Sequence, residues 1–257
     1  MKIKETLDYY VTRYNVSGFI DNDPIQIPHQ YQHPQDIEIT AFWTAMLAWG
    51  QRVTIINKAT ELFALMGNSP HEFILNHSEK DRKRFLDFKH RTFQPTDTLY
   101  FLEFFQQYYR KHERLESAFS QFITPENEDI SPALEGFHNL FFDLPDSPAR
   151  TRKHVATPAR KSTCKRLNMF LRWMVRNDNQ GVDFGIWKNI NPAQLMIPLD
   201  VHVERIARKF GLIKRKQRDW KTVVELTQFL RKLDPNDPAK YDFALFGYGI
   251  EAQMKKI

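Results

Sequence analysis

Cysteine is almost absent from this sequence, since Cys164 is the only one in 257 residues. A single thiol excludes an internal disulfide and any zinc or iron–sulfur site built on four cysteines. No apolar run approaches the ~20 residues of a membrane span, and the opening segment MKIKETLDYY lacks the apolar core of a secretory signal. We therefore expect a cytoplasmic protein with no membrane contact, no metal and no other cofactor.

Glycine is also scarce, since the sequence contains only nine, so few are available for hairpin turns. Strand-like alternation is rare, and apolar residues recur instead at helical spacing, which predicts an all-α fold. Residues 145–163 are rich in Pro, Ser, Thr and Arg and are expected to form a loop. Helices are expected over residues 36–50, 54–67, 69–88, 97–123, 132–144, 164–176, 200–210, 220–233 and 238–246, with Asp36 as the candidate cap of the first.

The aromatic side chains of these helices are expected to fill the core rather than to stack on bases. They are Trp43, Trp49, Phe101, Phe104, Phe105, Trp173 and Phe243.

Charge is unevenly distributed along the chain. Residues 150–257 hold 23 Lys and Arg against 10 Asp and Glu, a net charge of +13, whereas residues 1–149 hold 14 against 21, a net charge of −7. A basic half indicates a polyanionic partner, most often nucleic acid. The alternative is a solvated basic surface without a partner.

The segment MIPLDVHVERIARKFG joins an apolar run to a basic amphipathic helix at Asp200. The position after Pro198 suits a helix cap, in which the carboxylate accepts backbone N–H groups. The same geometry suits catalysis, because a capped carboxylate is held in place and can stabilise a developing cation. Both interpretations stay open from local sequence alone.

The segment from Pro145 to Arg166 contains seven Lys and Arg and one acidic residue, so it is a candidate phosphate-binding loop that leads into a helix. In that helix Lys165, Arg172 and Arg176 are expected opposite the buried face. They form either a solvated stripe or the lining of a cleft in which Lys165 reacts. A lysine becomes a nucleophile through burial or neighbouring cations.

A glycine-ended helix, LAWG, is followed by Gln51 and Arg52 and then by the next helix. An amide and a guanidinium at the tip of such a loop can probe a base or a phosphate. A polar helix–helix turn is the alternative.

These segments, in this order, resemble the helix-hairpin-helix DNA glycosylase superfamily, the group of endonuclease III and the 8-oxoguanine glycosylases. The superfamily's aspartate precedes a histidine or arginine and a helix, as Asp200 does in IPLDVHVERIARKFGL, and its loop glutamine matches Gln51 in AFWTAMLAWGQRVTIINKATELF. The segment LDPNDPAKYDFALFGYG resembles the last core helix. The gap of 35 residues from Lys165 to Asp200 is similar to the archaeal 8-oxoguanine branch, and the whole chain resembles an uncharacterised bacterial family related to the superfamily.

The resemblance implies a two-lobed helical fold with a central cleft, in which one lobe spans residues 36–165 and the other combines 1–35 with 166–257. It implies a base-excision DNA glycosylase that acts on a damaged base such as an oxidised purine. Asp200 stabilises the positive sugar, and Lys165 attacks the anomeric carbon to form a Schiff base that permits strand cleavage. The expected partner is duplex DNA, bound by a monomer through Gln51, Arg52, Arg160, Lys161, Arg166 and Arg172, with Trp187 and His202 as candidates beside the base.

One departure from the superfamily keeps other functions open. The stretch that corresponds to its glycine-rich hairpin, HVATPARKSTCKRL, contains no glycine. If Lys165 is not the nucleophile, Lys161 is the alternative, or Asp200 orients a water in a glycosylase without lyase activity. The rival from another class is a non-catalytic protein that binds DNA or RNA, and a third is a helical protein with an acidic protein partner.

Overall fold

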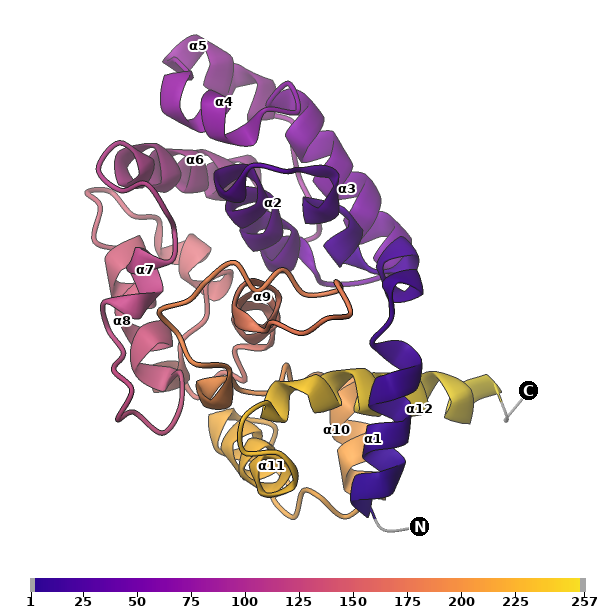
Figure 1. Ribbon diagram of the computed structural model, residues 1–257. Coiled ribbons are helices and arrows are strands. Elements are labelled where there is room, and N and C mark those ends of the chain that lie inside the picture. The colour runs from indigo at the N-terminus through magenta and orange to yellow at the C-terminus, as the bar shows by residue number, and fades with distance from the viewer. Residues whose placement is uncertain (1–2, 255–257) are drawn as a thin grey trace. The chain divides into compact units, whose positions relative to one another are not determined.

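The computed structural model describes the chain from Ile3 to Met254, and over this range it is all-α, as the sequence predicts (Figure 1). In the described part no β-strand forms, and His90 and Phe93 make an isolated bridge. Contacts divide the chain into two compact units. Unit 1 comprises Met1–Asp21, Ile123–Pro132 and Thr157–Ile257, and unit 2 comprises Asn22–Phe122 and Ala133–Ala156. The lobe boundaries implied by the resemblance stay a prediction.

Unit 2 is built around the buried helix α2 (Pro34–Leu47). In α2 every residue from Ile37 to Leu47 is buried, because this helix is apolar on nearly all sides and other elements surround it. Rings of α2, α6 (Pro95–Tyr109) and α8 (Ser131–Phe141) pack together, with Phe42 touching Phe105 edge to face and Phe137 at a centroid distance of 5.6 Å. The helices are α2 (Pro34–Leu47), α3 (Arg52–Leu65), α4 (Pro70–Asn76), α5 (Glu79–Arg82), α6 (Pro95–Tyr109), α7 (Ser117–Ser120) and α8 (Ser131–Phe141).

The helix expected over residues 36–50 begins earlier and ends earlier than predicted, and Asp36 is not its cap. Proline at the first position starts α2 after His33, and the Asp36 carboxylate instead accepts the His71 N–H, at 2.8 Å, in the first turn of α4. Trp49 beyond the helix was expected in the core. It is 48% exposed, because α2 has already ended at Leu47.

Two expected helices, over residues 69–88 and 97–123, are each split in the structure. The first is interrupted at Ser78, whose side chain and Asp81 form a capping box that starts α5. The second ends at Tyr109 because the buried Glu38 carboxylate of α2 needs donors. The chain turns there so that the Arg114 side chain and the Leu115 N–H bind Glu38 at 2.9 and 3.0 Å.

Unit 1 consists of α1 (Ile3–Tyr14), α9 (Lys165–Val175), α10 (Val201–Lys209), α11 (Trp220–Leu233) and α12 (Tyr241–Met254). The sequence did not predict α1, which lies against α12 (Figure 1). Gly247 permits this close approach, since a Cβ there would sit 2.1 Å from the Tyr14 ring. The predicted buried face of α9 is confirmed, because Leu167, Phe170, Leu171 and Met174 are at most 1% exposed.

Candidate functional site

The helix α9 begins at Lys165, after a loop in which Lys161 and Cys164 have left-handed backbone. Lys161 has φ 59° and Cys164 has φ 48°, conformations that glycine adopts at little cost and other residues at about 1 kcal/mol. The chain therefore makes its turns before α9 without glycine.

Hydrogen bonds fix this loop in place. The Trp220 N–H binds the Lys161 carbonyl at 3.3 Å, which ties the loop to the start of α11. The buried Asn168 side chain donates to the Thr163 carbonyl at 3.2 Å, and the Ser162 hydroxyl accepts the Cys164 N–H at 3.1 Å. Lys165 consequently leaves a loop whose path is set by neighbours in the same unit.

Asp200 caps α10, as one of its two predicted roles requires. One carboxylate oxygen, Oδ1, accepts the His202 and Val203 N–H groups at 2.8 and 2.9 Å. The other oxygen, Oδ2, lies 3.7 Å from Lys165 Nζ. The two side chains are 29% and 31% exposed, so the structure places an amine and a fixed carboxylate together where solvent reaches both.

Behind this pair, α9 carries a buried charge network rather than the exposed basic stripe that the sequence predicted. Arg172 and Arg176 are 3% and 2% exposed. Arg172 pairs with Asp183 at 3.2 Å and with Asp242, and Arg176 Nη1 pairs with Asp183 at 2.9 Å. Arg172 is therefore occupied inside unit 1 and does not offer its guanidinium to a phosphate.

Asp242, in the first turn of α12, was not identified from the sequence. Burial raises its pKa to about 6, against the opposing effect of the Arg172 guanidinium, and the Asp200 charge raises it further while Lys165 lowers it. The charges of Asp242, Asp200 and Lys165 therefore influence one another. An available signal was the aspartate in KYDFALFGYG, because a carboxylate within an apolar helix needs a buried partner.

The remaining predicted residues of unit 1 lie in different surroundings. Arg160, Lys161 and His202 are exposed, and Arg166 is half-buried. Trp187 was expected to wall a base pocket, but it is 1% exposed and packs edge to face on Phe170 at 5.2 Å. It fills the core of unit 1 because the connector that carries it hydrogen-bonds to the end of α9.

In unit 2, Gln51 and Arg52 lie at an exposed tip between α2 and α3. Gly50 has φ 118°, and a Cβ there would sit 2.4 Å from the Arg91 guanidinium. Arg91 lies over the Trp49 ring at 4.8 Å, and Val53 is 68% exposed. The tip thus presents an amide, cations and apolar surface together.

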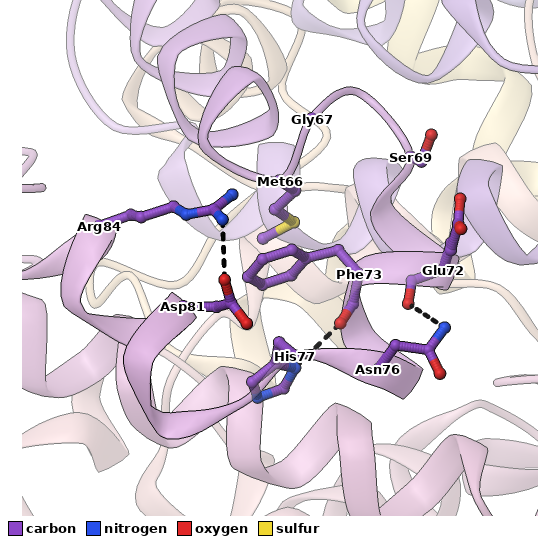
Figure 2. Close-up of a pocket in the computed structure, with 9 residues that line it drawn as sticks. All are labelled: Met66, Gly67, Ser69, Glu72, Phe73, Asn76, His77, Asp81 and Arg84. Atoms are coloured by element: carbon purple, nitrogen blue, oxygen red, sulfur yellow. Dashed lines mark hydrogen bonds and ion pairs between the residues drawn. The ribbon is translucent and has the colours of Figure 1, made fainter.

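A hollow of about 330 Å³ elsewhere in unit 2 is lined by the end of α3 and by α4 and α5 (Figure 2). Its polar groups largely bind one another, since Arg84 pairs with Asp81 at 2.7 Å and His77 Nδ1 lies 3.0 Å from the Phe73 carbonyl oxygen. It lacks a matched acid and nucleophile, so the pair in unit 1 is the stronger candidate for chemistry.

Among the described residues, no three His, Cys, Asp or Glu side chains gather as metal ligands would. No helix in the described range is both long and apolar enough to cross a bilayer. No curated protein and no solved structure matches the chain. A family described as "Protein of unknown function (DUF2400)" matches residues 23–251, which is most of the sequence. The chain therefore belongs to the DUF2400 family.

Proposed function

We propose that this protein is a base-excision DNA glycosylase with AP-lyase activity, and that Lys165 and Asp200 are its catalytic residues. The observation that carries the proposal is their separation. Lys165 Nζ and Asp200 Oδ2 are 35 residues apart in the sequence and 3.7 Å apart in the structure, at a place that solvent reaches. The resemblance of the segments around both residues to the helix-hairpin-helix superfamily supports the same assignment.

Asp200 stabilises the cation that develops on the sugar as the bond to the base breaks. Its position is fixed by two backbone N–H donors at the start of α10. A charge that is already aimed needs no reorganisation during the reaction, and removing one such group typically costs about 100- to 1,000-fold in rate.

Lys165 forms the covalent intermediate. Its neutral amine attacks the anomeric carbon as the bond to the base breaks, and the base leaves with a proton. The bond from the anomeric carbon to the ring oxygen then breaks, the ring oxygen takes a proton, and the opened sugar is held as a Schiff base. Loss of a proton from the neighbouring sugar carbon permits elimination of the 3′ phosphate. The damaged nucleotide must first leave the stack, at a cost of a few kcal/mol. This step requires that the substrate reach an amine which is 29% exposed.

DNA binding is supplied by the basic loop before α9 and by the tip in unit 2. In the loop, Arg160 and Lys161 are exposed and accessible to phosphates. At the tip, Gln51 corresponds by resemblance to the superfamily's loop glutamine, and Trp49 and Val53 contribute exposed apolar surface on which bases stack. The substrate we favour is duplex DNA with an oxidised purine.

The experiment uses the full chain and end-labelled duplexes containing 8-oxoguanine, hypoxanthine, uracil, thymine glycol or an abasic site. We expect base release from at least one lesion and, with borohydride, a covalent protein–DNA adduct. K165A should form no adduct, whereas K161A, which alters the exposed neighbouring lysine, should still form it when the protein saturates the duplex. An adduct that persists in K165A and is lost in K161A would move the nucleophile to Lys161.

The competing function is a non-catalytic nucleic-acid binder, which the exposed charge of the loop before α9 also favours. It requires salt-sensitive binding to duplex DNA or structured RNA, with no base release from any duplex of the panel and with affinity unchanged in D200N. That combination of results would replace the enzyme proposal.

A further inference from the structure

Asp242 is a carboxyl group in the immediate surroundings of the Lys165–Asp200 pair. It lies at the start of α12, which packs against α10, the helix that Asp200 caps. Its partner Arg172 is seven residues after Lys165, so both cations project from the same face of α9. Three separate helices therefore bring Asp242 to the candidate site.

We propose that the Asp242 carboxylate accepts the proton that Lys165 must release before its amine can attack, an inference that rests on the proposed function of the Lys165–Asp200 pair. Asp200 is less suited to this task. Its Oδ1 already accepts two backbone N–H groups, and its negative charge is required opposite the sugar cation. Asp242 is a positioning residue, since it acts through Lys165.

The charged groups that face Asp242 come from each element around it. Arg172 and Lys165 project from α9, Asp183 from the segment after α9, and Asp200 from the start of α10. On α1, Asp8 accepts the hydroxyl of the neighbouring Tyr241 at 3.0 Å. Burial, opposed by Arg172, places the pKa of Asp242 at about 6, so this carboxyl exchanges protons near neutral pH.

The proton balance of Schiff-base formation is complete with this group. The Lys165 ammonium gives one proton to the Asp242 carboxylate, which leaves a neutral amine and a neutral acid. The amine adds to the sugar aldehyde, an internal proton shift gives the carbinolamine, and its hydroxyl leaves as water after it takes the proton from Asp242. The carboxylate is restored. Asp242 is 13% exposed and Lys165 is 29% exposed, so solvent reaches both groups, and the proposed transfer passes through a water.

The first test measures borohydride trapping on abasic-site duplex between pH 5 and pH 8.5. The wild-type rate should rise with pH through about 6, because Asp242 must be ionised to accept a proton. In D242N the trapping rate should not rise through this pH, and at pH 7.5 it should be about 100-fold lower than in the wild type. D237N is the matched control, since Asp237 binds Arg176 at 2.8 Å at the other end of the same network. D237N should keep both the rise of the trapping rate through about pH 6 and the wild-type rate at pH 7.5.

A second measurement needs no DNA, so it separates this inference from the proposed function. Reductive methylation of Lys165 with formaldehyde and cyanoborohydride is followed by peptide mass spectrometry, with the exposed Lys221 as internal reference. The ratio of Lys165 to Lys221 should change through pH 6 in the wild type and D237N, and not in D242N. A ratio with the same pH dependence in all three proteins overturns the role of Asp242. If borohydride traps no adduct but D242N still changes the pH dependence of the ratio, the lyase function is overturned. The coupling of Asp242 to Lys165 then still holds.

Discussion

Each unit of this protein contains a largely buried aspartate paired with an arginine, yet the two carboxyl groups differ in their pKa. In unit 2, Asp97 is 0% exposed and receives hydrogen bonds from Arg150, from the Thr151 hydroxyl at 2.7 Å and from the Gln94 N–H at 2.8 Å. His154 Nε2 lies 3.3 Å from the same carboxylate. Burial raises the pKa of Asp97, but these donors outweigh it and set the pKa at about 2.

In unit 1, burial prevails at Asp242, and its pKa is about 6. Arg172 must serve Asp183 as well as Asp242, and Asp200 adds a second negative charge nearby. The difference teaches that burial alone does not decide the protonation state of a carboxyl group. The number of hydrogen-bond donors that it has, and whether it shares them with another carboxylate, also decide it. Asp97 fastens the loop after α8 to α6, whereas Asp242 remains able to exchange a proton beside the candidate site.

The largest expected effect is the loss of activity in D200N. Asparagine caps a helix about as well as aspartate, so the stability of α10 should change by less than about 0.5 kcal/mol. The negative charge is lost, and base release should fall about 100- to 1,000-fold. D219N is the matched control, because Asp219 caps α11 by accepting the Thr222 N–H at 3.0 Å. It should retain full activity, and an equal loss in both variants would show that cap geometry, not charge, is being measured.

The next effect compares one substitution in both clusters. R172M leaves Asp183 and Asp242 without a shared buried partner, and we expect a loss of about 3–5 kcal/mol in the free energy of unfolding. R150M should cost less than about 1 kcal/mol, because Arg150 is 38% exposed and Asp97 keeps its other donors. Urea unfolding measures both values, and equal losses would contradict the distinction between the clusters.

A smaller effect is expected on acidification. A carboxyl group with a lowered pKa contributes stability above its unfolded pKa of 3.8, and this contribution disappears as pH falls through the folded pKa of about 2. For Asp97 the contribution is about 2 kcal/mol. The wild type should therefore lose its advantage over D97N between about pH 4 and pH 2. A difference between the two urea midpoints that stays constant over this range would disprove the assignment.

The smallest effect concerns the exposed tip of unit 2. W49A should weaken binding to lesion duplex about tenfold, since stacking on one base is worth about 1–3 kcal/mol. Tyr9 on α1 is 51% exposed, close to the 48% of Trp49, so Y9A is a control for the loss of an exposed ring. Fluorescence anisotropy at one fixed salt concentration measures both affinities. Equal weakening in the two variants would remove the tip from the DNA-binding surface.

The sequence predicted much of the fold because apolar spacing and caps are local properties. The buried face of α9, the start of α10 at Asp200 and the bounds of α11 agree with the structure. The errors arose where a distant group intervened. Buried Glu38 draws Arg114 and Leu115 out of a helix, and Asp36 binds α4 instead of capping its own helix.

At the candidate site, too, the sequence predicted local features and missed those that depend on distant groups. Lys165 and Asp200 were identified from their local segments, and a resemblance joined them. Arg172 was assigned to an exposed stripe because helical spacing shows which residues share a face, but not what that face meets. Asp242 was missed because its importance arises only from its contact with Arg172 and from the charges around it.

The sequence by itself determined that this chain is helical, that its second half is basic and that Asp200 begins a helix. Hydrophobic periodicity, net charge and capping depend on residues a few positions apart, so they can be read along the chain. Only the tertiary structure decided which charges are buried, which share a partner and which stay in reach of solvent. Those properties depend on desolvation and on donors from distant segments, and no local pattern encodes them.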